Sequence, residues 1–361
     1  MIATRGVSAV EVKTRATACG FDLCGIAAVE SYAELEFLRE WIARGYHADM
    51  HYMARTAERR ADVRAVLPSA RSVIVLGTVY NTSQPYSTSG SDPARAAIAR
   101  YAWGDDYHIV IEQRMQQLVE SIREAAGAFE HRAYVDTGPI QERVYAHHAG
   151  LGWIGKNTCL INRELGSWVF LSAIICDLPL EPDSPALDHC GRCTMCIDAC
   201  PTGAITAPYQ LDSRRCISFM TIEAKGAVPV EHRTAIGEHA YGCDICQDVC
   251  PWNRRAAVSD DASWQPRDGL AFPPLLELWQ RTDEDLRGLL KGSPMKRAGI
   301  RRLRRNLAVA LGNSGEAAAA AVLELSAEPT ATDPLVQEHV AWAVEKLRPS
   351  TRDARSGQAH D

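Results

Sequence analysis

The chain has 361 residues, with 39 Lys and Arg against 45 Asp and Glu, and its formal net charge is −6. This length predicts two or three domains at roughly 150 residues each, and a hydrophobic content of 46% excludes a disordered, collagen-like or coiled-coil chain. Taken alone, the acidic balance argues against a nucleic-acid partner, which usually meets a basic surface. The sequence shows no signal-peptide pattern and no apolar run of membrane-spanning length, so we expect a cytoplasmic protein that does not contact a membrane.

Residues 1–180 predict an α/β domain. Helical periodicity predicts helices over 8–18, 107–124 and 140–149. Apolar and β-branched runs predict strands, and these cover 21–27, 72–80, 133–136 and 168–176. Because strands alternate with helices, we expect a layered α/β architecture.

Residues 263–361 predict an all-α region. Ser293 and Pro294 have the residue types that begin helices, and Gly312 with Asn313 is predicted to end the helix that follows. Two further helices, over 316–325 and 334–347, give a HEAT-like pattern. One apolar face is expected to point inward from the first of these helices, and it is formed by Ile300, Leu303, Leu307 and Leu311.

Eight of the 12 cysteines fall between Cys190 and Cys250. In a cytoplasmic chain, such a cluster indicates metal or redox chemistry rather than disulfides. Its first part has the Cys-x2-Cys-x2-Cys-x3-Cys-Pro spacing of bacterial ferredoxins, from Cys190 to Cys200. An incomplete second copy ends at Cys250, and its first position is Ala240. Cys216, which lies between the two copies, can replace the missing ligand.

This pattern predicts two 4Fe–4S clusters in an α+β ferredoxin-like domain over residues 181–262. Structural zinc is the alternative, but zinc sites use two pairs of Cys or His instead of these closely spaced runs. The remaining cysteines are interpreted as core residues. We assign one cluster to Cys190, Cys193, Cys196 and Cys250, and the other to Cys200, Cys216, Cys243 and Cys246.

A basic segment lies in the helical region. Residues 287–305 carry eight Lys and Arg and no acidic residue, so the net charge of the whole chain says little about this part. With the leucine face inward, the arginines are expected on exposed sides, where they can neutralise phosphates without reading a sequence. A solvated helix face or an intramolecular ion-pair surface is the alternative. The candidate contacts to a phosphate backbone in this segment are Arg301, Arg302, Arg304 and Arg305.

Several long motifs resemble epoxyqueuosine reductases, which are cobalamin- and iron–sulfur-dependent enzymes of tRNA modification. The similarity spans about residues 10–345, and the motifs that carry it cover 100–108, 134–143, 149–158, 166–168, 215–223 and 243–253. The resemblance implies that the chain reduces epoxyqueuosine to queuosine at the wobble position of the tRNA anticodon, the final step of queuosine biosynthesis. It further implies a cobalamin held between the α/β domain and the ferredoxin-like domain, two 4Fe–4S clusters, an external low-potential electron donor and a monomer.

The resemblance also implies roles for individual residues. Asp136 is expected to be the proton donor, whereas the residues alone favour a capping role in the Asp-Thr-Gly-Pro turn. Arg143 and Lys156 are expected to contact substrate, with a surface charge as the alternative for each. Val63 stands where the family has Pro, which puts the turn beside Arg60 in doubt. The implied cobalamin contacts are Arg60, Asp136, Asn157, Gly166, Ser167, Ser218 and Asp244.

No histidine ligand to cobalt is predicted. The motif Asp-x-His-x-x-Gly is not met, because Ile111 follows Asp106 and His108 where Gly is required. We interpret His108 and the pair His147 and His148 as surface or core-edge residues.

Two other functions stay open from the residues. A related, dehalogenase-like cobalamin reductase of a small molecule would not need the basic segment. An iron–sulfur electron-transfer protein would need the cysteines but not the segment around Asp136.

Overall fold

The structure is a computed structural model that describes residues 6–90, 92–325 and 328–348. The chain forms two compact units, of which unit 1 comprises residues 1–85, 104–214 and 244–265, and unit 2 comprises 86–103, 215–243 and 266–361. Each unit is therefore built from three separate stretches, and the units cut across the predicted boundaries at 180 and 262. Within the described residues, no helix combines the length and the apolar character needed to cross a bilayer.

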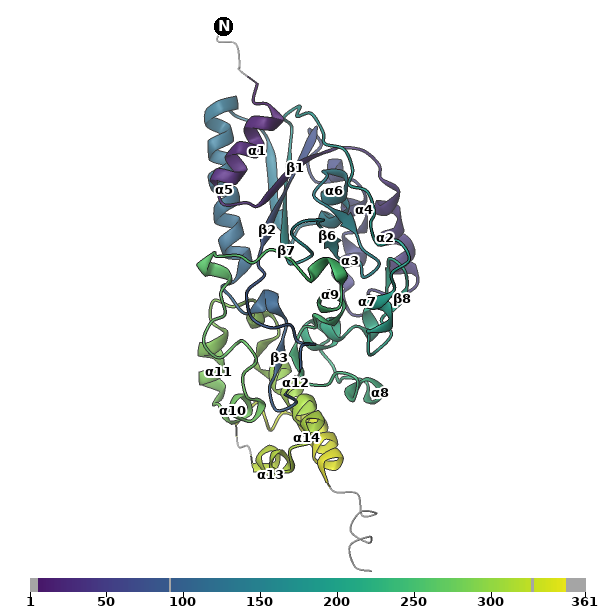
Figure 1. The fold of residues 1–361 in the computed structure, drawn as a ribbon, viewed down its shortest axis with the longest axis vertical. Helices are drawn as coiled ribbons and strands as arrows, with labels where there is room; N and C mark the ends of the chain where they lie inside the picture. The colour runs from purple at the N-terminus through teal and green to yellow at the C-terminus, as the bar shows by residue number, and fades with distance from the viewer. Residues whose placement is uncertain (1–5, 91, 326–327, 349–361) are drawn as a thin grey trace, which may run out of the picture. The chain divides into compact units, whose positions relative to one another are not determined.

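Unit 1 is organised around a four-stranded sheet with the order β1-β2-β7-β4 (Figure 1). The strands are β1 (Leu23–Ala28), β2 (Ser72–Val79), β4 (His131–Val135) and β7 (Val169–Cys176), so the four strands predicted from the sequence are confirmed to within a few residues. Every neighbouring pair is antiparallel. The alternation of strands and helices along the chain did not indicate this pairing.

Helices cover both faces of this sheet. On one face lie α1 (Ala9–Ala18) and α5 (Tyr107–Ala126), and on the other lie α2 (Ala33–Ala43) and α6 (Glu142–His148) (Figure 1). Because side chains alternate along a strand, Val73 and Val75 of β2 pack with α6 while Ile74 points to the opposite face. All three are fully buried, so β2 is a central strand that holds the two layers together.

The cysteine-rich part of unit 1 consists of short elements. Helix α7 (Met195–Asp198) lies inside the first cysteine motif and contacts α9 (Ile245–Asp248), which lies inside the second. The other α-helices of unit 1 are α3 (His51–Arg55) and α4 (Ala57–Ala61). Its other strands form two hairpins, β5 (Trp153–Ile154) with β6 (Leu160–Ile161) and β8 (Ile205–Ala207) with β9 (Gln210–Leu211).

Unit 2 is mostly helical, as predicted for the C-terminal region. Its elements are a parallel pair of β3 (Ala97–Ile98) and β10 (His239–Tyr241), a π-helix (Phe219–Glu223), and α8 (Val230–Arg233), α10 (Leu275–Gln280), α11 (Asp283–Leu290), α12 (Gly299–Ser314), α13 (Ala317–Leu325) and α14 (Pro334–Leu347). The predicted end of α12 at Gly312 is wrong. The helix continues to Ser314 because the left-handed residue that stops it is Gly315, with φ 72°.

The apolar face of α12 packs in the core of unit 2, as predicted. Leu303, Leu307 and Leu311 are buried together with Val336 and Val340 of α14. Ser293 accepts a hydrogen bond from the Met295 N–H and begins a 3-10 turn that precedes α12.

The predicted exposure of Arg304 and Arg305 is wrong, because both side chains are fully buried. The Arg304 Nε lies 2.7 Å from Asp283 Oδ1, and its other nitrogens donate to the carbonyl oxygens of Trp279 and Arg281. The periodicity of α12 identified its apolar face, but further segments of unit 2 also cover the opposite side. Arg304 therefore satisfies buried acceptors and is not available to a phosphate.

Arg305 is buried for the same reason. Its guanidinium donates to the carbonyl oxygens of Met220, Ala224 and Gly226, which belong to the π-helix and the loop after it. Arg302 is half-buried and donates to the Ile222 carbonyl at 2.7 Å. Arg301 differs from these three residues, because its side chain is 51% exposed and forms an ion pair with Asp333.

The buried His339 of α14 should make the stability of unit 2 depend on pH. Its Nε2 accepts the Val228 N–H at 3.0 Å, and burial lowers the pKa of His339 to about 4. The unfolded chain takes up a proton at about pH 6.5, so this contribution is present above that value and is lost as the pH falls toward 4. We expect a loss of roughly 3 kcal/mol across this window, measured by urea unfolding.

The control for this prediction is His339→Gln, which cannot be protonated in this range. Its unfolding free energy should change less between pH 6.5 and 4 than that of the unmodified chain. Parallel pH profiles for the two proteins would contradict the assignment to His339.

Candidate functional site

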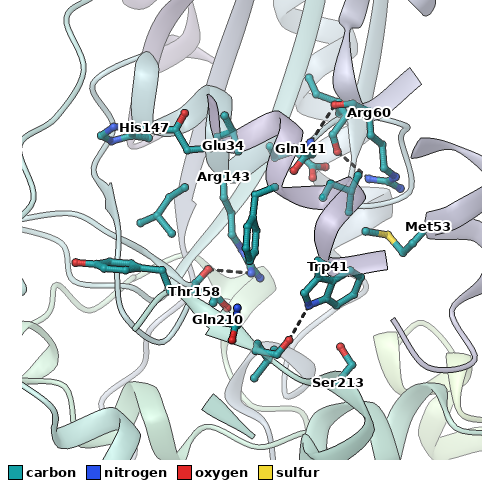
Figure 2. A pocket seen from close by; sticks show the side chains of 18 of the residues that line it. Glu34, Trp41, Met53, Arg60, Gln141, Arg143, His147, Thr158, Gln210 and Ser213 are labelled. Atoms are coloured by element: carbon teal, nitrogen blue, oxygen red, sulfur yellow. Dashed lines mark hydrogen bonds between the residues drawn. The ribbon is translucent and has the colours of Figure 1, made fainter. Parts of the chain in front are cut away.

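Unit 1 contains a cavity of about 800 Å³ whose walls come from α2, α6 and the β8–β9 hairpin (Figure 2). Trp41 and Met53 contribute apolar surface, and Arg60, Gln141 and Arg143 contribute polar groups. The Trp41 Nε1–H donates to the Leu211 carbonyl at 2.6 Å, which joins α2 to β9 at one wall. Most of the surface is apolar and the few polar groups are fixed, as in pockets that bind organic cofactors.

Arg60 is buried, so it is not a solvated surface charge. Its guanidinium donates to the Ile140 carbonyl at 2.9 Å and to Thr56 Oγ1 at 3.0 Å. The Gln141 side chain in turn donates to the Arg60 carbonyl at 3.1 Å. These reciprocal bonds fix the entry into α6 at the cavity wall. Arg143, also predicted as a site residue, lies at the same wall and donates to the Thr158 carbonyl at 3.0 Å (Figure 2).

Glu142 is a cavity residue that the sequence analysis missed, although it lies inside a quoted motif. Its Oε1 is buried and has no hydrogen-bond partner among the described residues. Burial, assisted by the negative charge of Asp136, raises the pKa of Glu142 to about 7, while Arg60 and Arg143 oppose this shift. The sequence could have indicated Glu142, because it is an acidic residue directly between Gln141 and Arg143.

Asp136 lies in the turn that directly follows β4, the strand at one edge of the sheet. Its backbone is left-handed, with φ 58°, a conformation that Asp tolerates better than most residues. Gly138 is required two residues later, since a Cβ there would lie 2.3 Å from the Tyr134 ring. The side chain of Asp136 is 45% exposed and lies beside His108.

His108 lies between two carboxylates. Its Nδ1 is 2.8 Å from Oδ1 of the buried Asp106, and its Nε2 is 3.3 Å from Asp136 Oδ2. A neutral imidazole has one N–H and can donate to one carboxylate only. The contact on the other side is a hydrogen bond only when a further proton is present, either on His108 or on Asp136. The arrangement can therefore hold a transferable proton at the exposed Asp136.

The surroundings of His108 favour its protonated form. Burial alone would lower the pKa of His108, but the hydrogen bonds with Asp136 and Asp106 outweigh burial and raise it above its usual value. His108, interpreted from sequence as a surface or core-edge residue, is 27% exposed, and its ring lies beside the predicted proton donor. Both residues lie in motifs quoted above, but only the fold brings them into contact.

The four cysteines predicted to hold the first cluster are neighbours within unit 1. Cys190 and Cys250 pack around Trp153, 60 residues apart in the chain. Burial raises the pKa of Cys196, and the nearby Cys190 and Cys193 raise it further. Burial likewise raises the pKa of Cys250 to about 11, with Cys190 and Cys196 contributing. Four converging thiols are a suitable ligand set for one 4Fe–4S cluster.

Lys156 lies beside this cysteine set. Its ammonium donates to the carbonyl oxygens of Gly191 at 2.6 Å and Cys193 at 2.9 Å. In this structure Lys156 supports the cysteine loop, and its predicted contact with substrate stays a prediction.

The second predicted set is divided between the units, with Cys200 and Cys246 in unit 1 and Cys216 and Cys243 in unit 2. Cys200 Sγ accepts the Ala204 N–H at 3.2 Å. Cys159, interpreted as a core residue, forms a hydrogen bond with Cys246 that lowers the pKa of Cys159 to about 7. Cys159 lies outside both cysteine motifs in the sequence, so the sequence did not predict its contact with Cys246.

Several predicted cobalamin contacts gather around the second cysteine motif. Asn157 is buried and donates to the Cys246 carbonyl at 3.2 Å. The Ser167 N–H donates to Asn253 Oδ1 at 2.8 Å, and a Cβ at Gly166 would lie 2.4 Å from the same oxygen. Asp244 is buried where α9 begins. Ser218 belongs to unit 2, where it precedes the π-helix.

Comparison with known families identifies two parts of the chain. A family model described as "4Fe-4S double cluster binding domain" matches residues 189–253. A second, described as "Epoxyqueuosine reductase QueG, DUF1730", matches residues 60–137.

Full-length relatives extend this result. The epoxyqueuosine reductase of Xanthomonas campestris is 42% identical over 93% of this chain and 95% of its own. The epoxyqueuosine reductase of Pseudomonas aeruginosa is 45% identical over 91% of this chain and 91% of its own. The chain belongs to the epoxyqueuosine reductase family. It is thus an oxidoreductase with a double 4Fe–4S domain, and the family predicted from the motifs is confirmed.

Solved epoxyqueuosine reductases share the fold. One, in complex with an epoxyqueuosine-modified tRNA-Tyr stem loop, has a TM-score of 0.84 at 31% identity and covers 94% of this chain and 89% of its own. The enzyme from Streptococcus thermophilus has a TM-score of 0.81 at 28% identity, with coverage of 98% and 94%.

Proposed function

We propose that this chain reduces epoxyqueuosine to queuosine in the anticodon loop of tRNA, with cobalamin and two 4Fe–4S clusters as cofactors. One observation carries the proposal: His108 lies between the carboxylates of Asp106 and Asp136, so a proton can be held at the exposed Asp136. The chain also belongs to the epoxyqueuosine reductase family. The wider similarity supports it, because a family member of this fold has been solved with an epoxyqueuosine-modified stem loop.

The residues present fit both kinds of cofactor. The first cysteine set offers four neighbouring thiols to one 4Fe–4S cluster. The cavity has aromatic and aliphatic walls and fixed polar groups that suit part of a large organic cofactor such as cobalamin, and Arg60 is the predicted cobalamin contact that lines it. When bound, cobalamin would supply a strongly reducing cobalt centre and the clusters would supply its electrons. Arg60 would hold it at the cavity, and Asn157, Gly166, Ser167 and Asp244 near the second cysteine motif; Ser218 stays a prediction from the resemblance.

The chain's own acid–base groups account for the protons of the reaction. Conversion of an epoxide to an alkene consumes two electrons and two protons and releases the oxygen as water. Asp136 would donate a proton to the departing oxygen, since its carboxyl group is accessible. His108, held by the buried Asp106, would then pass a proton back to Asp136. His108 acts through Asp136 and is a positioning and relay residue.

The activity should depend on pH through His108. Because the pKa of His108 is raised, its protonated form persists above the usual value near 6.5, and the rate should fall as the pH rises through the shifted pKa. In His108→Asn, this alkaline fall should move to lower pH or disappear, which a pH profile of single-turnover rates would measure. An unchanged profile would exclude His108 from the proton path.

For the tRNA, we retain Arg143 and Arg301 as candidate contacts, whereas the Arg302 guanidinium already donates to carbonyl oxygens of unit 2. Arg301 and Arg143 are accessible, and a cation can position an RNA backbone without reading its sequence. Arg304 and Arg305 are excluded because their donors are used inside unit 2. We also propose an external low-potential donor as the electron source and a monomeric enzyme.

Activity with a defined substrate tests the proposed function. The purified protein, loaded with iron and cobalamin and supplied with a strong reductant, should convert epoxyqueuosine in an anticodon stem loop to queuosine, as measured by mass spectrometry of the nucleosides. Binding of the stem loop should weaken steeply with salt. Turnover of only small halogenated molecules would favour the dehalogenase-like alternative, and absence of any turnover would favour an electron-transfer protein.

Iron content tests the first cysteine set. Cys250→Ser should lower the iron content from about eight to about four atoms per chain, because one of two four-iron clusters loses a ligand. Cys24→Ser is the matched control, since burial raises the pKa of Cys24 to about 12 and no cluster role is assigned to it. Iron analysis and absorption spectra measure the result. Full iron content in Cys250→Ser would contradict the ligand assignment.

A further inference from the structure

A cluster of Glu34, His147 and His148 lies outside the proposed acid–base site. One possible ligand atom from each residue lies within 4.8 Å of the others. His148 Nε2 is 3.3 Å from Glu34 Oε2. Glu34 comes from the first turn of α2 and the histidines from the last turn of α6, and Figure 2 shows Glu34 and His147 at the same end of the cavity.

Contacts within unit 1 already orient both imidazoles. His147 Nδ1 lies 3.3 Å from the Gly152 carbonyl, which can only accept, so Nδ1 carries the hydrogen and Nε2 keeps its lone pair. The His148 ring stacks on Tyr32 with centroids 3.6 Å apart and planes 10° apart. The Tyr32 hydroxyl is itself fixed by a 2.8 Å bond to the Ala28 carbonyl. The hydrogen bond of His147 to a carbonyl is typical of histidines that bind metals, and the stacking holds the plane of the His148 ring.

The third group has the charge that a cation requires. Burial opposes ionisation of Glu34, but hydrogen bonds from its own backbone N–H and from His148 outweigh burial and lower the pKa of Glu34. The cluster therefore combines an ionised carboxylate with two imidazoles and is partly accessible, and a metal ion would displace the proton that His148 donates to Glu34.

We propose that Glu34, His147 and His148 form a site for one divalent transition-metal ion of the zinc class. Two imidazoles and a carboxylate are zinc ligands, and three protein ligands leave a fourth position for water or an anionic group. Calcium and magnesium are disfavoured because they prefer all-oxygen ligand sets. The site would connect α2 to α6. It does not depend on the proposed activity and adds a role to two histidines interpreted above as surface or core-edge residues.

Zinc binding to the cluster-loaded protein tests this proposal. We expect isothermal titration with Zn²⁺ to show one site, and X-ray absorption to show nitrogen and oxygen neighbours at about 2.0–2.1 Å without a sulfur shell at about 2.3 Å. Glu34→Gln and His148→Ala should each weaken binding by at least about 10-fold, in the range seen when metal-site interactions are removed. His131→Ala, which changes a histidine of β4 outside the cluster, should bind Zn²⁺ like the unmodified chain.

Two results would overturn the proposal. A sulfur shell would place the zinc on cysteines, and equal affinity in Glu34→Gln would show that the carboxylate is not a ligand. If loss of the Tyr32 stacking unfolds His148→Ala, as circular dichroism would reveal, Glu34→Gln decides alone because it preserves size. The measurement uses no tRNA, so it stands or fails independently of the proposed function.

Discussion

Asp136→Asn should lower the turnover of epoxyqueuosine by about 100- to 10,000-fold while the iron and cobalamin contents stay unchanged. The amide has the size of the carboxyl group but cannot supply an acidic proton to the departing oxygen. It also cannot exchange a proton with His108, whose Nε2 is 3.3 Å from Asp136 Oδ2. Single-turnover conversion of a modified stem loop, followed by mass spectrometry, measures the effect.

Asp105→Asn is the matched control for this experiment. Asp105 lies in the same group of motifs but is exposed, and no role in proton transfer is assigned to it. It should leave turnover and cofactor content near those of the unmodified chain. Activity of Asp136→Asn close to the control would show that another group is the acid, and Glu142 would be the next candidate because its Oε1 is buried at the cavity and its pKa is raised to about 7.

Arg304→Ala should destabilise unit 2 by about 3–5 kcal/mol, the range for removal of one partner of a buried ion pair. Arg304 and Asp283 are 0% and 5% exposed and their charged atoms are 2.7 Å apart. The substitution leaves the Asp283 carboxylate buried without its cation and removes donors from two backbone carbonyls. Urea unfolding followed by circular dichroism measures the loss.

Arg301→Ala is the comparison, because its ion pair with Asp333 is largely exposed and should contribute less than about 1 kcal/mol. If Arg301 contacts tRNA, its removal should instead weaken binding of the stem loop and reduce the salt dependence. Equal stability of the two variants would contradict the structural role of Arg304. A large loss of tRNA affinity in folded Arg304→Ala would restore the role predicted from sequence.

Much of the fold follows from patterns that are local in the sequence. The apolar run of β2 and the Pro at the start of α14 predict elements within one or two residues of those observed, because hydrophobic periodicity and helix starts depend on neighbouring residues. The cysteine spacing predicts the double 4Fe–4S domain for a similar reason, since a short loop must bring its thiols to one cluster.

Contacts between distant segments were not predictable in this way. The amphipathic pattern of α12 showed which side is apolar, but it could not show that the loop after the π-helix brings carbonyl groups to Arg305. Likewise, Asp136 and His108 are 28 residues apart, and their contact depends on how β4 and α5 pack. The division of each unit into three stretches also depends on contacts between distant segments, so the sequence did not predict it.

The sequence by itself determined the family, the iron–sulfur domain and most helices and strands, because each depends on residue types at short spacing. The acid role of Asp136 came from the family resemblance and stays a prediction. Only the tertiary structure decided which charged groups are used internally and which are available for chemistry. The donors of Arg304 bind a buried carboxylate and backbone oxygens, whereas the Asp136 side chain is accessible and lies beside His108. The physical reason is desolvation: a charge removed from water must find its partners inside the fold, and those partners come from distant parts of the chain.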